Sequence, residues 1–232
     1  MKKNKILIWG AGSQALIAKL MIENNLVYYK NKKVISNEIL YLVDPFLKKP
    51  SFKSNIKFIN NKIKFRRILK KVNSFIVCVG AHHGYARYSI SKELIKLKLK
   101  PLSIISNTAY IDTTCKLGLG LQIMPNVVVN CYSKIDDFCL LNTSSTIEHQ
   151  CNIGKGTHIM GSASITGGVN IKKFSTIGTG ASILPGVIIH QGAYVGAGSV
   201  VKKNVLKNDV VVGVPAKFLK KNNQFLDLSF FR

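Results

Sequence analysis

The chain has 232 residues, of which 47% are hydrophobic and 19% charged, a composition typical of a globular protein and not of a disordered one. No apolar run approaches the ~20 residues that cross a bilayer, and the opening MKKNKILIWGAG reaches glycines before a signal-peptide core could form, so we expect a cytoplasmic protein without a membrane partner. The formal net charge of +24 comes from lysines dispersed along the chain, and the sequence has no recognisable nucleic-acid-binding module. We therefore attribute the charge to biased codon usage or to polyanionic small ligands, and do not expect a nucleic-acid partner.

The first hundred residues alternate predicted strands with predicted helices. We expect buried strands at residues 5–9, 41–44 and 74–80, and helices at residues 15–24 and 85–97. Strands that alternate with helices predict a small Rossmann-like parallel α/β sheet.

A glycine-rich turn follows the first predicted strand. Gly10, Gly12 and Ala15 match the loose G-x-G-x-x-G/A fingerprint, in which backbone amides approach a phosphate at a helix N-terminus. The α/β part, residues 1–104, has room for about one mononucleotide half, which favours a nucleotide or nucleotide-sugar site over NAD. We therefore predict a nucleotide-sugar-binding domain here, although the turn could serve only to let the helix pack closely.

Asp44 and Gly80 end the next two predicted strands. Both are expected at carboxyl ends of parallel strands, where open α/β sheets bind ligands, and either could equally cap a turn or a helix. His82 and His83 occupy the glycine-flanked loop GAHHG, where they either contact a ligand or are solvated.

From Ile111 onward an aliphatic residue recurs at every sixth position. The sixteen positions are Ile111, Leu117, Ile123, Val129, Ile135, Leu141, Ile147, Ile153, Ile159, Ile165, Ile171, Ile177, Ile183, Ile189, Val195 and Val201. A strand has period 2 and a helix period 3.6, so neither produces a strict period of six. A hexapeptide β-helix does, because each short strand directs one aliphatic residue into the core before the chain turns a corner.

A second track of small or β-branched residues lies four positions after the first. Four of the five cysteines fall within this repeat, and with no C-x-x-C pair they are expected to be reduced packing residues. The repeat resembles the left-handed parallel β-helix of hexapeptide acyltransferases, in which three hexads make one triangular coil. That resemblance implies an all-β domain over residues 105–232, whose last apolar residues could cap the open end of the core.

The segment LNTSSTIEHQCNIG at 141–154, the hexads around it and VGVPAK at 212–217 resemble the sugar N-acetyltransferases of bacterial N-glycan, bacillosamine and perosamine pathways. The related sialic acid O-acetyltransferases are similar too. The resemblance spans the whole architecture and is most specific over residues 140–216. It implies an acetyl-CoA-dependent N-acetyltransferase of a nucleotide-linked amino sugar for surface-glycan biosynthesis, without a metal. It also implies a homotrimer with active sites between subunits.

The resemblance also implies roles for particular residues. The histidine matching His149 is the family's general base, and the one matching His158 contacts the thioester region of acetyl-CoA, beside backbone near Gly167. Along the coenzyme lie the positions matching Thr179 and Ala197, and Lys217 is either a ligand of the coenzyme phosphates or a solvated lysine. The positions that match the nucleotide-sugar site are Gly12, Ser13, Gln14, Asp44 and Gly80.

The chain departs from the family pattern in three places. Relatives usually carry an acidic residue directly after the catalytic histidine, whereas this chain has Gln150 there and Glu148 before the histidine. Gln14 stands where many relatives have histidine, and residues 27–38 look like an insertion. The nucleotide and the amino sugar therefore stay open.

The expected chemistry is direct transfer. A sugar ammonium must lose a proton before it attacks a thioester, and imidazole is suited to accept that proton near neutral pH, which makes His149 the candidate base. A backbone N–H near Gly167 would hold the oxyanion. No serine or cysteine has an evident activating base beside it, which argues against an acyl-enzyme. His190, in a later hexad, is expected to be exposed.

Three other functions fit parts of the sequence. A sugar O-acetyltransferase would use the same site on a hydroxyl acceptor. A zinc-dependent carbonic anhydrase would share the solenoid but needs three imidazoles around one metal, and a third partner for His149 and His158 is not evident. A non-enzymatic scaffold or nucleic-acid binder would bind no coenzyme.

Overall fold

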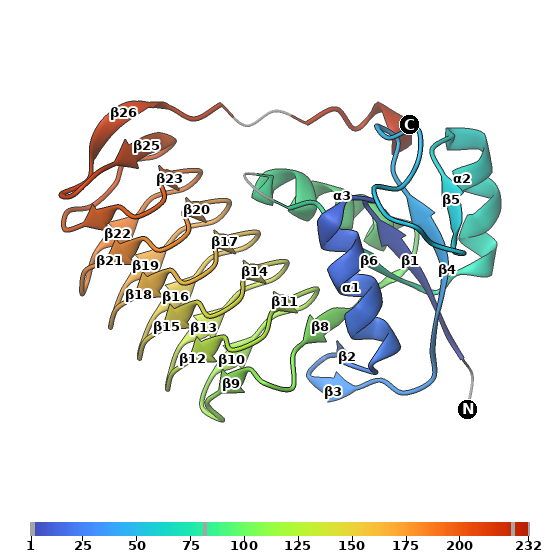
Figure 1. Ribbon diagram of the computed structural model, residues 1–232, viewed down its shortest axis with the longest axis horizontal. Helices are drawn as coiled ribbons and strands as arrows, with labels where there is room; N and C mark the ends of the chain where they lie inside the picture. Colours follow the sequence, from blue (N-terminus) through green and yellow to red (C-terminus); the bar gives the residue numbers. More distant parts are fainter. Residues whose placement is uncertain (1–2, 81–82, 224–225, 232) are drawn as a thin grey trace.

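The computed structural model describes residues 3–80, 83–223 and 226–231, and shows an N-terminal α/β sheet packed beside a long β-helix (Figure 1). This arrangement confirms the predicted fold class, an α/β part followed by a left-handed parallel β-helix. Among the described residues, none of the helices combines the length and apolar character needed to cross a bilayer.

The N-terminal sheet is entirely parallel, with strand order β5-β4-β1-β6-β7. Its strands are β1 (Asn4–Trp9), β4 (Asn37–Val43), β5 (Lys57–Ile59), β6 (Ser74–Val77) and β7 (Lys100–Pro101). Its helices are α1 (Ser13–Glu23), α2 (Lys62–Ile68, continued by the 3-10 turn Leu69–Lys71) and α3 (Gly84–Lys96). The predicted strands and helices are all present, but the sequence patterns did not identify β5, α2 or β7.

Side chains alternate across β1, and this alternation divides the N-terminal part into two cores. Ile6 and Ile8 face α1 and belong to the same buried cluster as the β-helix interior. Leu7 and Trp9 face the opposite side, where they pack with α2 and α3. The sheet is therefore covered on both faces, as a parallel sheet requires.

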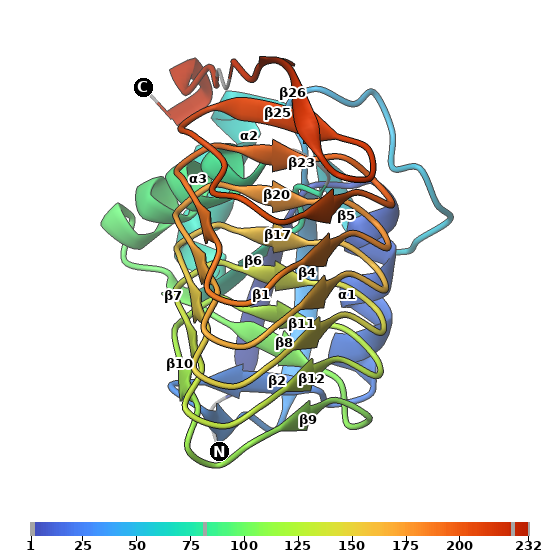
Figure 2. The ribbon, with the colours of Figure 1, turned by 90° about the vertical axis from the view of Figure 1, so that its left-hand side faces the viewer.

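The β-helix has three faces, each a parallel sheet (Figure 2). The ten-stranded face contains β8 (Ser103–Ile105), β11 (Gln122–Ile123), β14 (Leu140–Leu141), β17 (His158–Ile159), β20 (Thr176–Ile177), β23 (Tyr194–Val195) and β25 (Asp209–Val212), with antiparallel β2 (Val27–Tyr29), β3 (Lys32–Lys33) and β26 (Lys217–Lys221) at its ends. The six-stranded face contains β9 (Tyr110–Ile111), β12 (Val128–Val129), β15 (Thr146–Ile147), β18 (Ser164–Ile165), β21 (Ser182–Ile183) and β24 (Val200–Val201). The five-stranded face contains β10 (Lys116–Leu117), β13 (Lys134–Ile135), β16 (Asn152–Ile153), β19 (Asn170–Ile171) and β22 (Ile188–Ile189).

Each strand pairs in register with the strand one coil later, so that Ile147 lies beside Ile165 and Ile165 beside Ile183. The sixteen residues of the aliphatic track each end one of the two-residue strands. All are buried except Ile111 and Leu117, which are half-buried in the first coil. The period of six therefore arises because each face of the prism contributes one inward-pointing aliphatic side chain to every coil.

The corners of the prism need a left-handed backbone conformation. From Asn126 to Gly198, the residue three places after each aliphatic position has φ between 56° and 71°. Glycine adopts this conformation without strain, whereas other L-residues pay about 1–2 kcal/mol for it. The later coils mostly use glycine, and Gln150 is one of the non-glycine corners.

The two ends of the β-helix are closed differently. At the first end, the hairpin of β2 and β3 adds antiparallel to β8, with Val27 opposite Ile104. Residues 27–38, the apparent insertion, thus contribute to the β-helix face. At the other end, Val205 and Val211 extend the buried cluster past Val201, and β26 pairs with β25.

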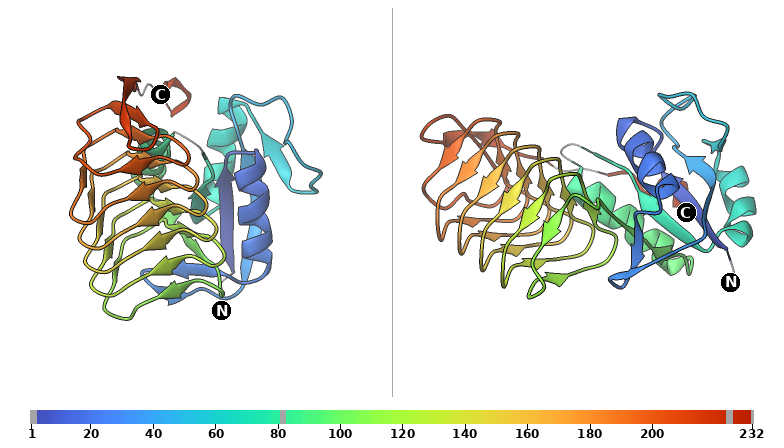
Figure 3. Two further views of the ribbon diagram at one scale, coloured as in Figure 1. Left: turned by 60° about the vertical axis from the view of Figure 1, so that its left-hand side comes forward. Right: turned by 60° about the horizontal axis from the view of Figure 1, so that its bottom comes forward.

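Arg87 on α3 fastens the two parts together. Its side chain is 1% exposed, and its guanidinium donates hydrogen bonds to the carbonyls of Val79 at 2.9 Å, Phe138 at 2.9 Å and Gly156 at 3.0 Å. Burial lowers the pKa of Arg87 to about 10, so the group still carries its charge at neutral pH. Because a charged donor is costly to leave unpaired, this cluster holds α3 rigidly against the corners of the solenoid (Figure 3).

Candidate active site

His149 lies at the corner between the six-stranded and five-stranded faces, and its side chain is exposed. Its Nδ1 is 3.1 Å from Oε1 of Gln150. An amide oxygen can only accept, so this contact favours the tautomer with the proton on Nδ1 and the lone pair on Nε2. The left-handed conformation of Gln150, with φ of 58°, sets the direction from which its side chain approaches the ring.

Gly167 occupies the same corner one coil further along. A Cβ placed on Gly167 would lie 2.5 Å from both Nε2 and Cε1 of His149, so the imidazole packs against a surface that only glycine leaves open. The Gly168 N–H donates to the His149 carbonyl at 3.0 Å and fixes the two corners to each other. Within the described chain, the Gly167 N–H donates to no backbone carbonyl. The corner therefore presents a base nitrogen beside a backbone donor.

Glu148 makes hydrogen bonds with Asn130 and Ser133. Its carboxylate accepts a hydrogen bond from Nδ2 of Asn130 at 2.8 Å, and its carbonyl accepts one from the Ser133 hydroxyl at 2.7 Å. Glu148 follows the end of β15 and His149 belongs to the corner turn after it. Gln150, and not Glu148, is the residue that orients the imidazole.

Two buried cysteines of the β-helix, Cys139 and Cys151, are poor nucleophiles. Burial raises the pKa of the Cys151 thiol, and it raises the pKa of Cys139 to about 12. The reactive form of cysteine is the thiolate, so both side chains stay protonated and unreactive at neutral pH.

The predicted coenzyme residues lie on other parts of the prism. His158 sits on the ten-stranded face between Leu140 and Thr176 and is 2% exposed. Thr179 and Ala197 are exposed at the corner between the ten-stranded and six-stranded faces, where the Gly198 N–H donates to the Thr179 carbonyl at 2.8 Å. Exposed Lys217 begins β26 at the far end. One chain thus brings His149 and Gly167 together but leaves Thr179 and Ala197 on a different edge.

The N-terminal sheet has a cavity of about 500 Å³ at the carboxyl ends of β1, β4 and β6, which we call the nucleotide cavity. Of the predicted sugar-nucleotide residues, Gly12 and Asp44 line it. The Asp44 carboxylate accepts hydrogen bonds from the Ala11 and Phe46 N–H groups, each at 3.0 Å. Asp44 therefore fastens the glycine turn and also forms part of the cavity wall.

Gly10 explains why the turn is glycine-rich. Its φ is 106°, and a Cβ there would lie 2.6 Å from the Cys78 carbonyl oxygen. Gly12 begins α1 as its N-cap, and no atom lies within 4 Å of the space that its side chain would occupy. The backbone before α1 is thus open to a phosphate, which a helix N-terminus stabilises.

The other three predicted residues lie outside the lining of this cavity. Ser13 is exposed at the start of α1, and Gly80 lies beside Gln14, with 3.9 Å between the Cβ positions. Gln14 donates from Nε2 to Oε1 of Gln122 at 2.9 Å, and Gln122 in turn donates to the Val77 carbonyl at 2.8 Å. Gln14 and Gly80 thus mark the side of the N-terminal part that meets the β-helix.

Sequence reasoning missed several residues of the cavity. Trp9, Leu226 and Asp227 line it together with His83, whereas His82 lies outside the described residues. A tryptophan at the end of the strand before the glycine turn was a usable signal for Trp9. Nothing local could have indicated Leu226 and Asp227, since they arrive from the other end of the chain.

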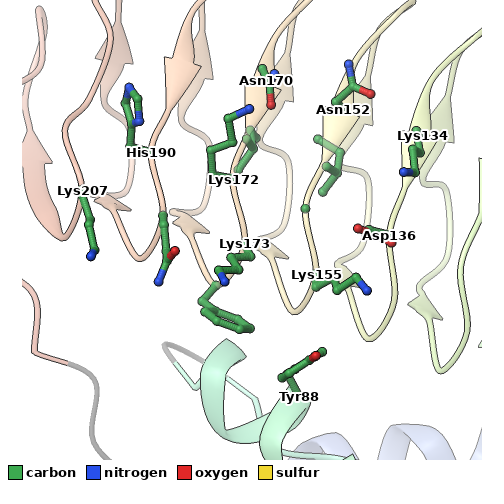
Figure 4. Close-up of a pocket in the computed structure, with 15 residues that line it drawn as sticks. Tyr88, Lys134, Asp136, Asn152, Lys155, Asn170, Lys172, Lys173, His190 and Lys207 are labelled. Atoms are coloured by element: carbon green, nitrogen blue, oxygen red, sulfur yellow. The ribbon is translucent and has the colours of Figure 1, made fainter.

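A separate basic groove of about 770 Å³ lies between the five-stranded face and α3 (Figure 4). The charged residues along it are Lys134, Lys155, Lys172, Lys173 and Lys207, with Asp136 as the acidic one. Tyr88 from α3 forms its opposite wall. His190 also lines this groove and not the corner of His149. Among the described residues, no group of three or more His, Cys, Asp or Glu side chains is placed to hold a metal ion.

Comparison with solved structures shows the same architecture elsewhere, whereas no family model matches the chain. PerB from Caulobacter crescentus, in complex with CoA and GDP-perosamine, has a TM-score of 0.79 at 21% identity over 94% of this chain and 98% of that one. The acetyltransferase domain of PglB from Neisseria gonorrhoeae has a TM-score of 0.79 at 23% identity, over 94% of this chain and 100% of that one. WeeI from Acinetobacter baumannii has a TM-score of 0.78 at 23% identity with the same coverage. The chain shares their fold.

Replacing Gly167 by alanine should push the His149 ring out of place and lower acetyl-CoA-dependent turnover by about a hundredfold, as ångström-scale misplacement of a catalytic group does. Gly168→Ala is the matched control. It strains a residue with φ of 71° but adds a methyl group with nothing within 4 Å. Steady-state kinetics of both variants measure the difference, and equal losses would contradict a specific contact between residue 167 and the imidazole.

Gln150→Glu should move the acidic limb of the pH profile of kcat/KM to higher pH. A carboxylate beside the imidazole stabilises the protonated ring, so a higher pH is needed to produce the neutral imidazole that acts as the base. Gln150→Gly suits the left-handed corner and lacks the acceptor, and it serves as the control. An unmoved limb in the glutamate variant would show that residue 150 does not contact the base during catalysis.

Proposed function

We propose that the chain is an acetyl-CoA-dependent N-acetyltransferase that acts on the amino group of a nucleotide-linked amino sugar, in surface-glycan biosynthesis. The observation that carries this proposal is the imidazole of His149, oriented by Gln150 and lying against the open backbone of Gly167. A base and an oxyanion donor at one point are what aminolysis of a thioester requires.

In the proposed reaction His149 takes a proton from the sugar ammonium through Nε2. The free amine then forms a bond to the acetyl carbonyl carbon, and the carbonyl oxygen, now an oxyanion, is held by the Gly167 N–H. When the tetrahedral intermediate collapses, the C–S bond breaks and the imidazolium gives its proton to the leaving sulfur of coenzyme A. The regenerated imidazole then accepts the second proton from the nitrogen, which leaves a neutral amide. No side chain is acylated, in agreement with the raised pKa values of Cys139 and Cys151.

The nucleotide cavity supplies the second substrate site in this proposal. Its glycine turn opens toward a phosphate at the N-terminus of α1, and its apolar remainder suits a nucleoside. The structurally similar PerB was crystallised with CoA and GDP-perosamine, and the PglB domain with acetyl coenzyme A, which supports this pair of substrates. These likenesses leave open which nucleotide and which sugar this chain accepts.

We further propose that the active enzyme is a homotrimer with each site between two subunits. His149 and Gly167 occupy one edge of the prism, and Thr179 and Ala197 another. A site that uses both edges needs two chains. When the His149 edge of each chain pairs with the Thr179 edge of the next chain, the chains form a closed ring. The coenzyme would then lie in the groove between two β-helices, with Lys217 near its phosphates.

The first test is a substrate screen with UDP-, GDP- and dTDP-linked amino sugars and acetyl-CoA, following thiol release. We expect turnover with at least one amino sugar and a loss of two to four orders of magnitude in kcat for His149→Ala, since that is the usual contribution of a general base. His190→Ala is the control, since His190 lies in the separate basic groove. Turnover with hydroxyl acceptors alone would replace the proposal by O-acetylation, and full activity of the His149 variant would remove that residue from the mechanism.

A mixing experiment tests the shared site. His149→Ala removes one edge and Ala197→Trp blocks the other, so each variant alone should be inactive. Trimers assembled at random from a 1:1 mixture should recover about a quarter of the wild-type activity, because a site that combines the intact edge of each variant forms at that frequency. Mixtures that stay inactive after confirmed subunit exchange would place each site within a single chain.

A further inference from the structure

The end of the chain returns to the N-terminal sheet. Beyond β26, the described residues from 226 onward lie on the face of the sheet covered by α2 and α3 (Figure 1). Residues 226–231, which we call the C-terminal segment, place Leu226, Leu228, Phe230 and Phe231 half-buried against the core on that face. The segment therefore ties the end of the chain to the N-terminal sheet beside α3, because Leu226 lines a cavity together with Ala86 and Ile90 of that helix.

The anchor of the C-terminal segment is Trp9. Phe231 stacks on the indole with 4.7 Å between ring centroids and 15° between planes, and Phe230 meets it edge-on at 5.4 Å. Phe65 of α2 completes the cluster, at 5.3 Å from Phe230. Trp9 is also the last residue of β1, directly before the glycine turn. The segment consequently docks at the rim of the nucleotide cavity.

Two residues of the segment form part of the cavity wall. Leu226 and Asp227 line the nucleotide cavity together with Trp9 and Gly12. The Asp227 carboxylate accepts hydrogen bonds from the Ser229 N–H at 2.7 Å and the Ser229 hydroxyl at 2.8 Å. These bonds hold the exposed Asp227 carboxylate in a fixed direction beside the apolar part of the nucleotide cavity.

The direction of a bound nucleotide sugar follows from what lies on each side of the glycine turn. Gln14 and Gly80 lie toward the β-helix, where the sugar must meet acetyl-CoA. The C-terminal segment lies on the other face of the sheet, where Leu226 lines the apolar part of the nucleotide cavity and also shares a second pocket with Phe174 and Gly192 of the β-helix. With the diphosphate at the start of α1, the nucleoside enters the part of the cavity lined by Leu226 and Asp227.

We propose that the C-terminal segment completes the nucleotide-sugar site, with Leu226 against the base and the Asp227 carboxylate accepting hydrogen bonds from N–H or O–H groups of the nucleoside. This inference rests on the proposed function. The segment is thus a specificity element for the nucleoside, supplied by the last residues of the β-helix chain.

The experiment uses the single tryptophan of the sequence as its reporter. UDP, GDP and dTDP are titrated against the full chain, and Trp9 fluorescence reports binding in the cavity. A chain that lacks residues 226–232 should bind the preferred nucleotide at least tenfold more weakly and show the same rise in KM for the nucleotide sugar, with KM for acetyl-CoA within twofold of wild type. Asp227→Asn keeps the aromatic anchor and should raise both nucleotide constants about three- to tenfold.

Phe218→Ala provides the matched control, since it removes an exposed phenyl ring from β26 without touching Trp9. It should leave nucleotide affinity unchanged. If the wild-type chain acetylates a nucleotide sugar while the shortened chain and Asp227→Asn keep wild-type nucleotide constants, the inference is wrong and the proposed function stands. If the wild-type chain binds no nucleotide and acetylates no nucleotide sugar, the proposed function itself fails.

Discussion

Register stacking between coils is the constraint on which the site depends. In this solenoid the neighbour of a residue in space is the residue one coil away, as the pairing of Ile147 with Ile165 shows. His149 consequently meets Gly167, and no local turn geometry could bring them together. A one-residue slip in any strand would turn an aliphatic side chain outward and move the imidazole off its glycine, so core packing enforces the geometry of the site. The same residues that stabilise the fold therefore position the base.

The β-helix could be predicted because an aliphatic residue recurs at every sixth position of the sequence. The other parts of the fold depend on contacts between distant segments. Short β5, β7 and α2 carry too few residues for a periodic signal. The hairpin near Val27 looked like an insertion because its partner, β8, lies far along the chain. At the site, the resemblance to sugar N-acetyltransferases indicated His149 and Gly167, but only the fold shows that Gln150 contacts the ring while Glu148 binds Asn130. The prediction that the last apolar residues cap the open end of the solenoid is wrong for residues 226–231, which pack on the N-terminal sheet instead, because the docking place of a non-repeating tail depends on distant contacts.

Charge acts on a longer range than these contacts. The net charge of +24 and the lysines of the basic groove produce a positive potential over a protein whose proposed substrates are both polyanions. Such a field raises encounter rates and fades as salt increases, but it does not discriminate one nucleotide from another. Discrimination requires short-range groups with fixed directions. In the nucleotide cavity those groups are the glycine turn, the Asp44 carboxylate that secures it, and the wall of apolar side chains.

Two contacts of different chemistry hold the N-terminal sheet, one to the solenoid corners and one to the C-terminal segment. The Arg87 guanidinium donates hydrogen bonds to the Val79 carbonyl after β6 and to the Phe138 and Gly156 carbonyls at the solenoid corners. Because each of these bonds is directional, together they resist sliding of the sheet along the solenoid. The aromatic cluster on Trp9 is less directional and lies directly at the nucleotide cavity. Both contacts border the nucleotide cavity, since Val79 and Trp9 line it, but only the Arg87 contact reaches the solenoid, through directional hydrogen bonds to Phe138 and Gly156. If the C-terminal segment forms the nucleoside wall as proposed, substitutions in it change nucleotide specificity without altering the Arg87 hydrogen bonds that hold the sheet against the solenoid.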